Sequence, residues 1–233
     1  MANAPKPVDN VGPRRVPLGN VMPVVPTLSE ERRLWRQGFD LVAGMDEVGR
    51  GPLAGPVVAA AVILSPSADF RWLFHVRDSK ELSAAEREEL APYIWRDALA
   101  VGVGFVSHTV IDRIGIAEAT RQAMLRAVGE MERRPEYLLI DAFSLPACVL
   151  PQKGIIDGDA RCISIAAASI VAKVARDRFM EQHDQRFAGY GFAQNKGYAT
   201  RQHLEALRRL GPCEIHRRSF APVREMVSGG VAL

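Results

Sequence analysis

The chain of 233 residues is poor in cysteine and lacks long apolar runs. Its three cysteines, Cys148, Cys162 and Cys213, lie too far apart for a zinc knuckle or a C-x-x-C redox motif, and their odd number argues against a disulfide framework. No apolar run reaches the roughly 18 residues of a membrane span. Prolines also interrupt the first 26 residues, where a signal peptide would need a continuous apolar stretch. We therefore expect a cytoplasmic protein that neither crosses a membrane nor is exported.

The net charge is also small, at +3, but it is unevenly distributed. Residues 173–233 carry 11 basic and 6 acidic side chains, whereas residues 1–172 carry 19 basic and 21 acidic ones. A basic surface for a polyanion beside an acidic site for cations would produce this distribution. An ordinary solvated basic face would produce it as well.

The rest of the composition, 48% hydrophobic and 24% charged, is typical of a globular protein that folds without a metal or a disulfide. Six of the 15 prolines lie in residues 1–26, which predicts a flexible arm there. No internal repeat is present.

The pattern of apolar residues after this arm predicts an α/β domain. Helices are expected over residues 31–37, 83–95, 117–133, 164–185 and 200–210, the first two introduced by the capping boxes Thr27/Glu30 and Ser83/Glu86. Strands are expected over residues 41–46, 56–64, 99–107 and 137–141. The order of these elements indicates a mixed central sheet flanked by helices, with a C-terminal helical extension.

Two adjacent carboxylates, Asp46 and Glu47, end the first apolar strand. Such a pair is unfavourable at the end of a buried strand unless a cation neutralises it, and Mg²⁺ or Mn²⁺ prefers carboxylate oxygens. Because successive side chains of a regular strand point to opposite faces, we expect the pleat to break at Glu47. The alternative is that one of the two is a strand-end charge in water.

Asp141 ends a second apolar strand in the same way, which favours a carboxylate cluster, although a turn-forming aspartate is common at such a place. On the helix expected over 164–185, Ser169, Lys173 and Asp177 share one stripe, beside Arg176. If this stripe faces the cluster, Asp177 is a further ligand and Lys173 a phosphate contact. The alternative is a surface Lys173–Asp177 ion pair.

Gly49-Arg50-Gly51 offers backbone groups on either side of a guanidinium. Alone, this motif is usually a turn. Beside Asp46 and Glu47, its amides could reach a ribose 2′-hydroxyl, the group that distinguishes RNA from DNA.

The chain resembles ribonuclease HII, the type 2 ribonuclease H, in motifs that follow one another from about residue 40 to residue 222. The matching segments are Asp46-Glu47-Val48-Gly49-Arg50-Gly51-Pro52-Leu53-Ala54-Gly55-Pro56-Val57, Asp78-Ser79-Lys80-Glu81-Leu82-Ser83, Ile140-Asp141, Ile165 to Asp177, Asn195-Lys196-Gly197-Tyr198-Ala199-Thr200 and His216-Arg217-Arg218-Ser219-Phe220.

The resemblance implies a ribonuclease H-like fold, with a catalytic domain over residues 27–190 and a substrate-binding extension over 191–233. It implies an endonuclease that uses Mn²⁺ or Mg²⁺ on RNA–DNA hybrids and on single ribonucleotides in duplex DNA, cutting on their 5′ side. The implied acidic, metal-binding residues are Asp46, Glu47, Asp141 and Asp177. The implied substrate contacts are Gly49, Arg50, Gly51, Lys80, Ser169, Lys173, Arg176, Lys196 and Tyr198, with Tyr198 packing on the sugar at the junction.

The chain departs from the family pattern at Asp157, where we expect a lysine in a Lys-Gly-Asp sequence. We interpret Asp157 and Asp159 as solvated residues of a glycine turn. A monomer is expected, and residues 219–233 show no obvious clamp-binding peptide, which leaves a sliding-clamp partner open.

Three other functions compete with this interpretation. Ribonuclease HIII carries a sizeable N-terminal domain and a different residue in the glycine loop, so Arg50 and the short stretch before Asp46 argue against it. A magnesium-binding receiver of the response-regulator class is shorter and has no basic C-terminal extension. A non-catalytic nucleic-acid-binding protein on the same fold is the third alternative.

Overall fold

The structure is a computed structural model, and it describes residues 25–67, 71–76 and 80–228. Most of the expected N-terminal arm and the motif residues Asp78 and Ser79 lie outside the described residues. Within the described part, none of the helices combines the length and the apolar character that crossing a membrane requires.

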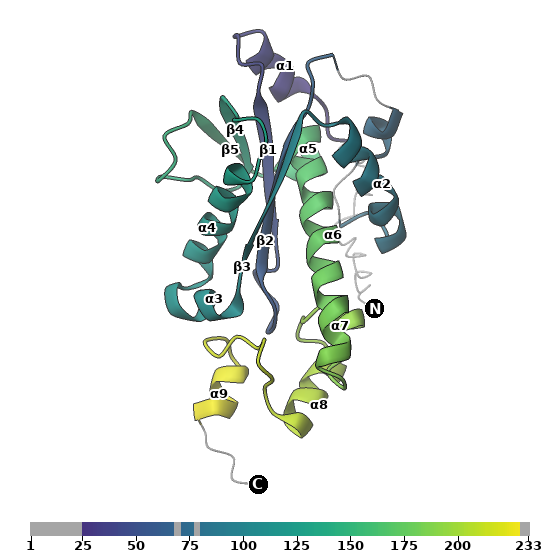
Figure 1. Ribbon diagram of the computed structural model, residues 1–233, viewed down its shortest axis with the longest axis vertical. Helices are drawn as coiled ribbons and strands as arrows, with labels where there is room; N and C mark the ends of the chain where they lie inside the picture. The colour runs from purple at the N-terminus through teal and green to yellow at the C-terminus, as the bar shows by residue number, and fades with distance from the viewer. Residues whose placement is uncertain (1–24, 68–70, 77–79, 229–233) are drawn as a thin grey trace, which may run out of the picture.

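A five-stranded mixed sheet forms the centre of the molecule (Figure 1). Its order is β3-β2-β1-β4-β5; β1 pairs antiparallel with β2, β2 pairs antiparallel with β3, and β4 is parallel to both β1 and β5. The strands are β1 Val42–Val48, β2 Val57–Ile63, β3 Ala100–Val106, β4 Tyr137–Asp141 and β5 Gln152–Ile155. The expected mixed sheet is confirmed. The short strand β5 was not predicted, because its sequence QKGI shows no alternation of apolar residues.

Helices cover both faces of the sheet, and β2 shows why. Its residues Ala60 and Val62 pack in the core on the side of α2 and α6, whereas Ala59 and Ala61 pack in the core on the side of α3 and α4. Every residue of β2 is therefore buried, which explains its continuous apolar run.

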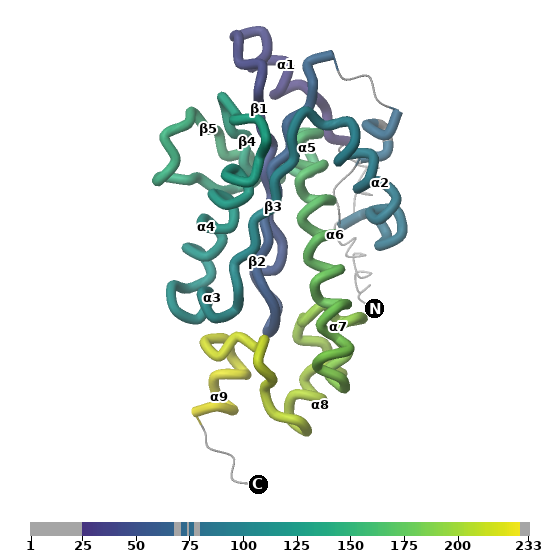
Figure 2. The backbone as a smooth tube through the Cα atoms, viewed as in Figure 1, coloured from purple at the N-terminus to yellow at the C-terminus, as the bar shows by residue number. Residues whose placement is uncertain are grey.

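The helices are α1 Ser29–Trp35, the 3₁₀ helix η1 Arg71–His75, α2 Ala84–Asp97, α3 His108–Ile114, α4 Ile116–Gly129, α5 Gly158–Arg161, α6 Ile163–Arg186, α7 Phe192–Asn195, α8 Arg201–Leu210 and α9 Val223–Ser228. The last three lie at one end of the sheet (Figure 1, green to yellow). The tube trace in Figure 2 shows the C-terminal segment, residues 191–228, passing beside the end of β1 and β2. There the Ala54 and His216 backbones form an isolated antiparallel bridge.

The helix starts test the predicted caps. Ser83 caps α2 as expected, because its side chain accepts from the Glu86 backbone while Glu86 accepts from the Ser83 backbone. The predicted Thr27 cap is wrong: α1 begins at Ser29, and the Thr27 N–H donates to the Arg161 carbonyl at 3.0 Å. The helix predicted over 117–133 is too long, because α4 ends at Gly129, and α3 before it was not predicted.

Helix α6 lies unusually close to β1, and this close packing positions the α6 side chains that border the site described below. Its first turns include three consecutive alanines, residues 166–168, and Gly44 of β1 lies opposite Ser164 and Ile165. A Cβ atom at Gly44 would lie 2.2 Å from the backbone carbon of Ser164, so only glycine permits this approach. The close packing brings Ser169 and Lys173 of α6 over the ends of β1 and β4.

Candidate active site

The carboxylates predicted at two strand ends come together. Met45 of β1 is paired with Ile140 of the parallel strand β4. Asp46 and Asp141, the next residue on each strand, therefore lie side by side. Together with Glu47, they line a cavity of about 300 Å³ at this end of the sheet. The cavity is the candidate active site.

The pleat does not break where the sequence predicted a break. Strand β1 runs on to Val48, and Glu47 keeps its pairing partner Ala59 in β2. The expectation was wrong because the cavity lies at the carboxyl ends of the strands, where successive residues of a regular strand can both border it. The Asp46 carboxylate accepts from the Glu47 N–H at 2.7 Å.

Burial disfavours the charged forms of all three carboxylates. It raises the pKa of Asp46 well above its usual range, and the charges of Glu47 and Asp141 raise it further. Burial raises the pKa of Glu47 to about 7, against the opposing effect of Arg50, whose Nη1 lies 3.6 Å from Oε1. The pKa of Asp141 is also raised by burial, although the Gly158 N–H donates to its carboxylate at 2.7 Å. A cation would relieve this electrostatic penalty.

The donor set fits a divalent cation. The Oε2 atom of Glu47 is buried without a hydrogen-bond partner, a position that a cation would satisfy. All the candidate ligand atoms are carboxylate oxygens, which suit Mg²⁺ and Mn²⁺. Among the described residues, no three His, Cys, Asp or Glu side chains stand close enough to enclose an ion.

A further acid, Asp159, lies beside Asp141, where the sequence predicted a solvated turn residue. Asp159 is buried, and its charge is among those that raise the pKa of Asp141. Its carboxylate lies 3.0 Å from the Lys80 ammonium, which borders the cavity. Asp159 is therefore not the solvated turn residue that its glycine turn predicted, because the adjacent Gly158 N–H donates to Asp141 and draws this turn to the site.

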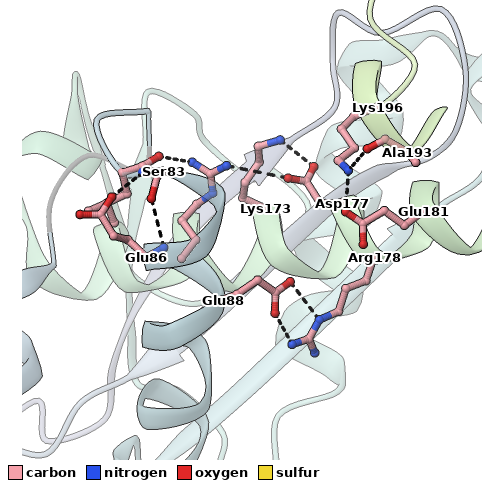
Figure 3. A network of polar contacts seen from close by, with 11 residues as sticks. Ser83, Glu86, Glu88, Lys173, Asp177, Arg178, Glu181, Ala193 and Lys196 are labelled. Carbon is pink, nitrogen blue, oxygen red and sulfur yellow. Dashed lines mark hydrogen bonds and ion pairs between the residues drawn. The ribbon is translucent and has the colours of Figure 1, made fainter. Parts of the chain in front are cut away.

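Asp177 lies among cations instead. Its carboxylate accepts from Lys173 at 2.6 Å (Figure 3) and lies 3.9 Å from Arg87. Like Asp159, it is not among the residues that line the cavity. Ser169 and Lys173, from the same stripe of α6, do line the cavity, and Ser169 donates to Asp46 and lowers the pKa of that carboxyl. The stripe thus faces the cluster, but only its first two residues reach the cavity.

Four cationic side chains border the same cavity as the carboxylates. They are Arg50, Lys80, Arg87 and Lys173. Arg87, on α2, was not predicted; it donates to the Leu82 carbonyl, and nothing in the local sequence indicates its direction. Acidic and basic groups at one cavity suit a substrate with both a cation and a phosphate.

The glycine loop forms one wall of the site. Gly49 has φ +93°, and a Cβ atom there would lie 2.3 Å from Nε of Arg176. Gly51 faces open space. The loop is fixed from behind, because Arg217 donates to the carbonyls of Gly49 and Arg50 at 2.6 and 3.0 Å. The loop backbone is therefore held in one conformation, with its Gly51 side open.

Arg176, on α6, is buried behind this loop and does not stand at the surface as the expected substrate contact would. Its side chain is wholly buried and donates to the carbonyls of Pro56 and Ala54 at 3.0 and 3.1 Å. Burial lowers the pKa of Arg176 to about 10 and that of Arg217 to about 9. From this position the Arg176 guanidinium supports the loop and does not reach the surface where a phosphate would bind.

Tyr198, in the turn between α7 and α8, borders the cavity and is 40% exposed. The guanidinium of Arg176 lies 5.8 Å from the centre of its ring. Lys196, two residues earlier, is engaged by Glu181 and by the carbonyl of Ala193 (Figure 3) and does not line the cavity. The structure thus brings Tyr198 to the site and leaves Lys196 outside it.

Comparison with known proteins identifies the family. The family model for ribonuclease HII matches residues 43–223. The ribonuclease HII of Geobacter metallireducens is 56% identical over 205 residues, which cover 85% of this chain and 95% of that protein. Among solved structures, ribonuclease H2 from Pyrococcus horikoshii OT3 is 25% identical with a TM-score of 0.68, covering 81% of this chain and 97% of that one.

A second solved structure is the complex of PCNA with ribonuclease HII from Archaeoglobus fulgidus. It is 30% identical to this chain with a TM-score of 0.61, and the match covers 72% of this chain and 87% of that one. The family model covers most of the chain, and more than half of the aligned residues are shared with a relative of nearly the same extent. The chain therefore belongs to the ribonuclease HII family of endonucleolytic hydrolases, which implies cleavage of the RNA strand in RNA–DNA hybrids.

Proposed function

We propose that this protein is a divalent-metal-dependent endonuclease that also cleaves on the 5′ side of single ribonucleotides in duplex DNA, leaving 3′-hydroxyl and 5′-phosphate ends. The observation that supports it most is the group of buried strand-end carboxylates in one cavity with four cations and a glycine loop. Mg²⁺ or Mn²⁺ is the expected metal.

Asp46, Glu47, Asp141 and Asp159 would hold the metal. The first three line one cavity, and Oε2 of Glu47 is buried there without a partner. Asp159 is included because it is buried and its charge raises the pKa of Asp141. When bound, divalent ions lower the pKa of water and stabilise negative charge on the leaving 3′ oxygen, so that no Ser, Cys or His nucleophile is required.

The basic side chains of the cavity would bind the scissile phosphate. Lys80, Arg87 and Lys173 border the cavity, and each is engaged by an acidic residue or a carbonyl group of the protein. A phosphate can take the place of such partners, because it offers several charged acceptor oxygens to each donor. These three residues thereby orient the phosphate toward the carboxylates.

The glycine loop and Tyr198 would choose the nucleotide. Backbone groups of Gly49, Arg50 and Gly51 can bond the ribose 2′-hydroxyl, whereas the Tyr198 ring would pack on the neighbouring deoxyribose, where a hydroxyl would not fit. Both elements border the same cavity from different sides. Together they would recognise a step from RNA to DNA.

A sliding clamp has no support from the described part of the tail. Phe220 is the one aromatic residue between Ser219 and Ser228. It packs against the core with the guanidinium of Arg217 5.0 Å from its ring. Residues 219–228 therefore present no exposed aromatic anchor, and a monomer on its nucleic acid stays the expected state.

Mapping of the product ends tests the proposed reaction. A duplex with one ribonucleotide, labelled at its 5′ end, is incubated with the protein and Mg²⁺ or Mn²⁺. We expect a single cut on the 5′ side of the ribonucleotide, with a 3′-hydroxyl on one product and a 5′-phosphate on the other. A 2′,3′-cyclic phosphate would contradict the proposal, because the ribose hydroxyl would then be the attacking group.

A further inference from the structure

Two buried histidines connect the residues that follow α8 to Tyr198, which precedes it. His203 on α8 and His216 beyond it are almost completely inaccessible, at 0% and 1% exposure, and their Nε2 atoms lie 3.1 Å apart. At the outer ends of this pair, Nδ1 of His216 lies 2.9 Å from the backbone nitrogen of Cys213, and Nδ1 of His203 lies 2.8 Å from the carbonyl oxygen of Tyr198.

These contacts permit one arrangement of protons. The Cys213 N–H can only donate, so Nδ1 of His216 accepts and a neutral His216 carries its proton on Nε2. That proton is donated to Nε2 of His203, which then carries its own proton on Nδ1 and donates it to the Tyr198 carbonyl. All four ring nitrogens are satisfied, with no alternative for a neutral pair.

A charged form of either ring would break the chain of bonds. An added proton would place two donors face to face, at Cys213 or between the two rings. Among the described residues, no carboxylate contacts the pair: its neighbours are the rings of Tyr190 and Phe192, the Cys213 thiol, the Gly197 backbone and, farther away, His108. Burial accordingly lowers the pKa of both histidines.

We propose that His203 and His216 are positioning residues that hold the Tyr198 peptide, and with it the exposed ring, in the place from which it recognises the junction. The inference rests on the role of Tyr198 in the proposed function. Because Tyr198 is 40% exposed, packing fixes its ring on one side only. Its backbone is fixed instead: the Tyr198 carbonyl accepts from His203 and from the Thr200 N–H, at 2.8 Å each.

The place of His203 in the fold supports this role. Its backbone N–H donates to the side chain of Thr200, the N-cap of α8, so the ring belongs to the rigid first turn of that helix. The preceding residues Lys196 and Gly197 have φ of +51° and +84°, a sharp turn whose exit needs an anchor. The histidine pair supplies that anchor from the core.

Two substitutions of His203 separate the bond to Tyr198 from the bond to His216. His203→Asn places an amide N–H near the position of Nδ1 and keeps the donor to Tyr198. His203→Gln reaches the position of Nε2 and keeps an acceptor for His216, but it loses the donor to Tyr198. The measured quantity is the ratio of kcat/KM for a single embedded ribonucleotide to kcat/KM for a long hybrid, with Tyr198→Ala as the reference and thermal unfolding as the folding control.

We expect His203→Gln to lower this ratio about tenfold, the effect of one lost hydrogen bond, and His203→Asn to stay within about twofold of wild type. Equal ratios in the Gln and Asn variants, while Tyr198→Ala lowers the ratio, would overturn the positioning role and leave the proposed function intact. An unchanged ratio in Tyr198→Ala would instead remove Tyr198 from the proposed function, and the positioning role with it.

Nitrogen-15 NMR of the wild-type protein provides a test that does not depend on the variants folding. We expect one slowly exchanging proton on Nε2 of His216, coupled across the hydrogen bond to Nε2 of His203, and a second proton on Nδ1 of His203. A proton on Nε2 of His203, or a charged ring at neutral pH, would overturn the inference.

Discussion

Two titratable side chains, Glu47 and His216, should give the metal-free protein opposite pH dependences of stability in nearly the same range. The pKa of Glu47 is about 7 in the folded chain against 4.5 without burial. The folded state therefore binds more protons than the unfolded state between these values, and its stability falls as the pH rises through them. We expect Glu47→Gln to raise the free energy of unfolding above pH 7 by on the order of 3 kcal/mol and to leave it unchanged below pH 4.

His216 provides the matched comparison of opposite sign. Burial lowers its pKa from 6.5 to about 4, so the unfolded state binds more protons and stability is lost as the pH falls through this range. Chemical denaturation between pH 4 and 8, without metal, measures both effects. A Glu47→Gln protein that follows the wild-type curve throughout would show that Glu47 is charged and satisfied in the metal-free fold.

Asp159 and Asp177 can be told apart by equivalent substitutions. Asp159→Asn should reduce turnover as severely as loss of Asp46, because Asp159 is buried with the cluster. Asp177→Asn should mainly release Lys173 and Arg87 and so have the smaller effect on kcat. Steady-state cleavage rates at saturating Mn²⁺ measure both, and the reverse order would return Asp177 to the cluster.

The sequence predicts some of these residues and not others for a physical reason. Asp46 and Asp141 end apolar strands, and this local pattern is visible without a fold. Asp159 lies in a glycine turn and Arg87 on an ordinary helix surface, so their importance comes only from the tertiary approach of distant segments. Arg176 shows the opposite failure, because a guanidinium on a helix stripe gives no sign that it is buried against backbone carbonyls.

At the scale of elements, the glycine loop depends on a buried arginine from the other end of the chain. Arg217 donates to the carbonyls of Gly49, Arg50, Gly55 and Pro56. A lysine cannot reproduce this fork of donors. We expect Arg217→Lys to destabilise the protein by about 3 kcal/mol or more and to lower the preference for ribonucleotides, since the loop loses its support.

Arg218→Lys is the control for this substitution, because Arg218 is the exposed neighbour. Thermal unfolding and the cleavage rate of a single embedded ribonucleotide are compared for the two variants. Equal stability and equal selectivity in both would mean that the glycine loop keeps its conformation without Arg217.

How well the sequence predicts each helix or strand depends on the strength of its local pattern. Helix α6, strand β2 and the capped helix α2 have long or sharply bounded patterns and were predicted to within a few residues. Strand β5 exists because Gln152 to Ile155 align beside β4, and the Thr27 N–H, which a capping box would pair with Glu30, donates to Arg161 instead. Both depend on partners far away in the sequence, which no local pattern contains.

At the scale of the whole molecule, the carboxyl ends of β1 and β4 gather the acids. The glycine loop, the residues before α2, α2 itself and α6 supply the cations, and the turn between α7 and α8 supplies the aromatic ring. The basic excess of residues 173–233 overstates the surface available for phosphates, because Arg176 and Arg217 are buried in it. The loop, α6 and the C-terminal segment share one core, which includes Leu53, Met180 and Phe192. The substrate-binding extension over residues 191–233 stays a prediction, but its described part packs directly behind the glycine loop.

The most direct test of the account is the single-turnover cleavage of a duplex with one ribonucleotide by wild type and by Asp141→Asn at saturating Mn²⁺, with hybrid binding measured on the same samples. Loss of a ligand charge weakens metal binding and leaves the phosphate contacts in place. We predict that Asp141→Asn folds, binds the hybrid with wild-type affinity and gives no detectable cleavage. A variant that cleaves at the wild-type rate would contradict the assignment of the active site to these carboxylates.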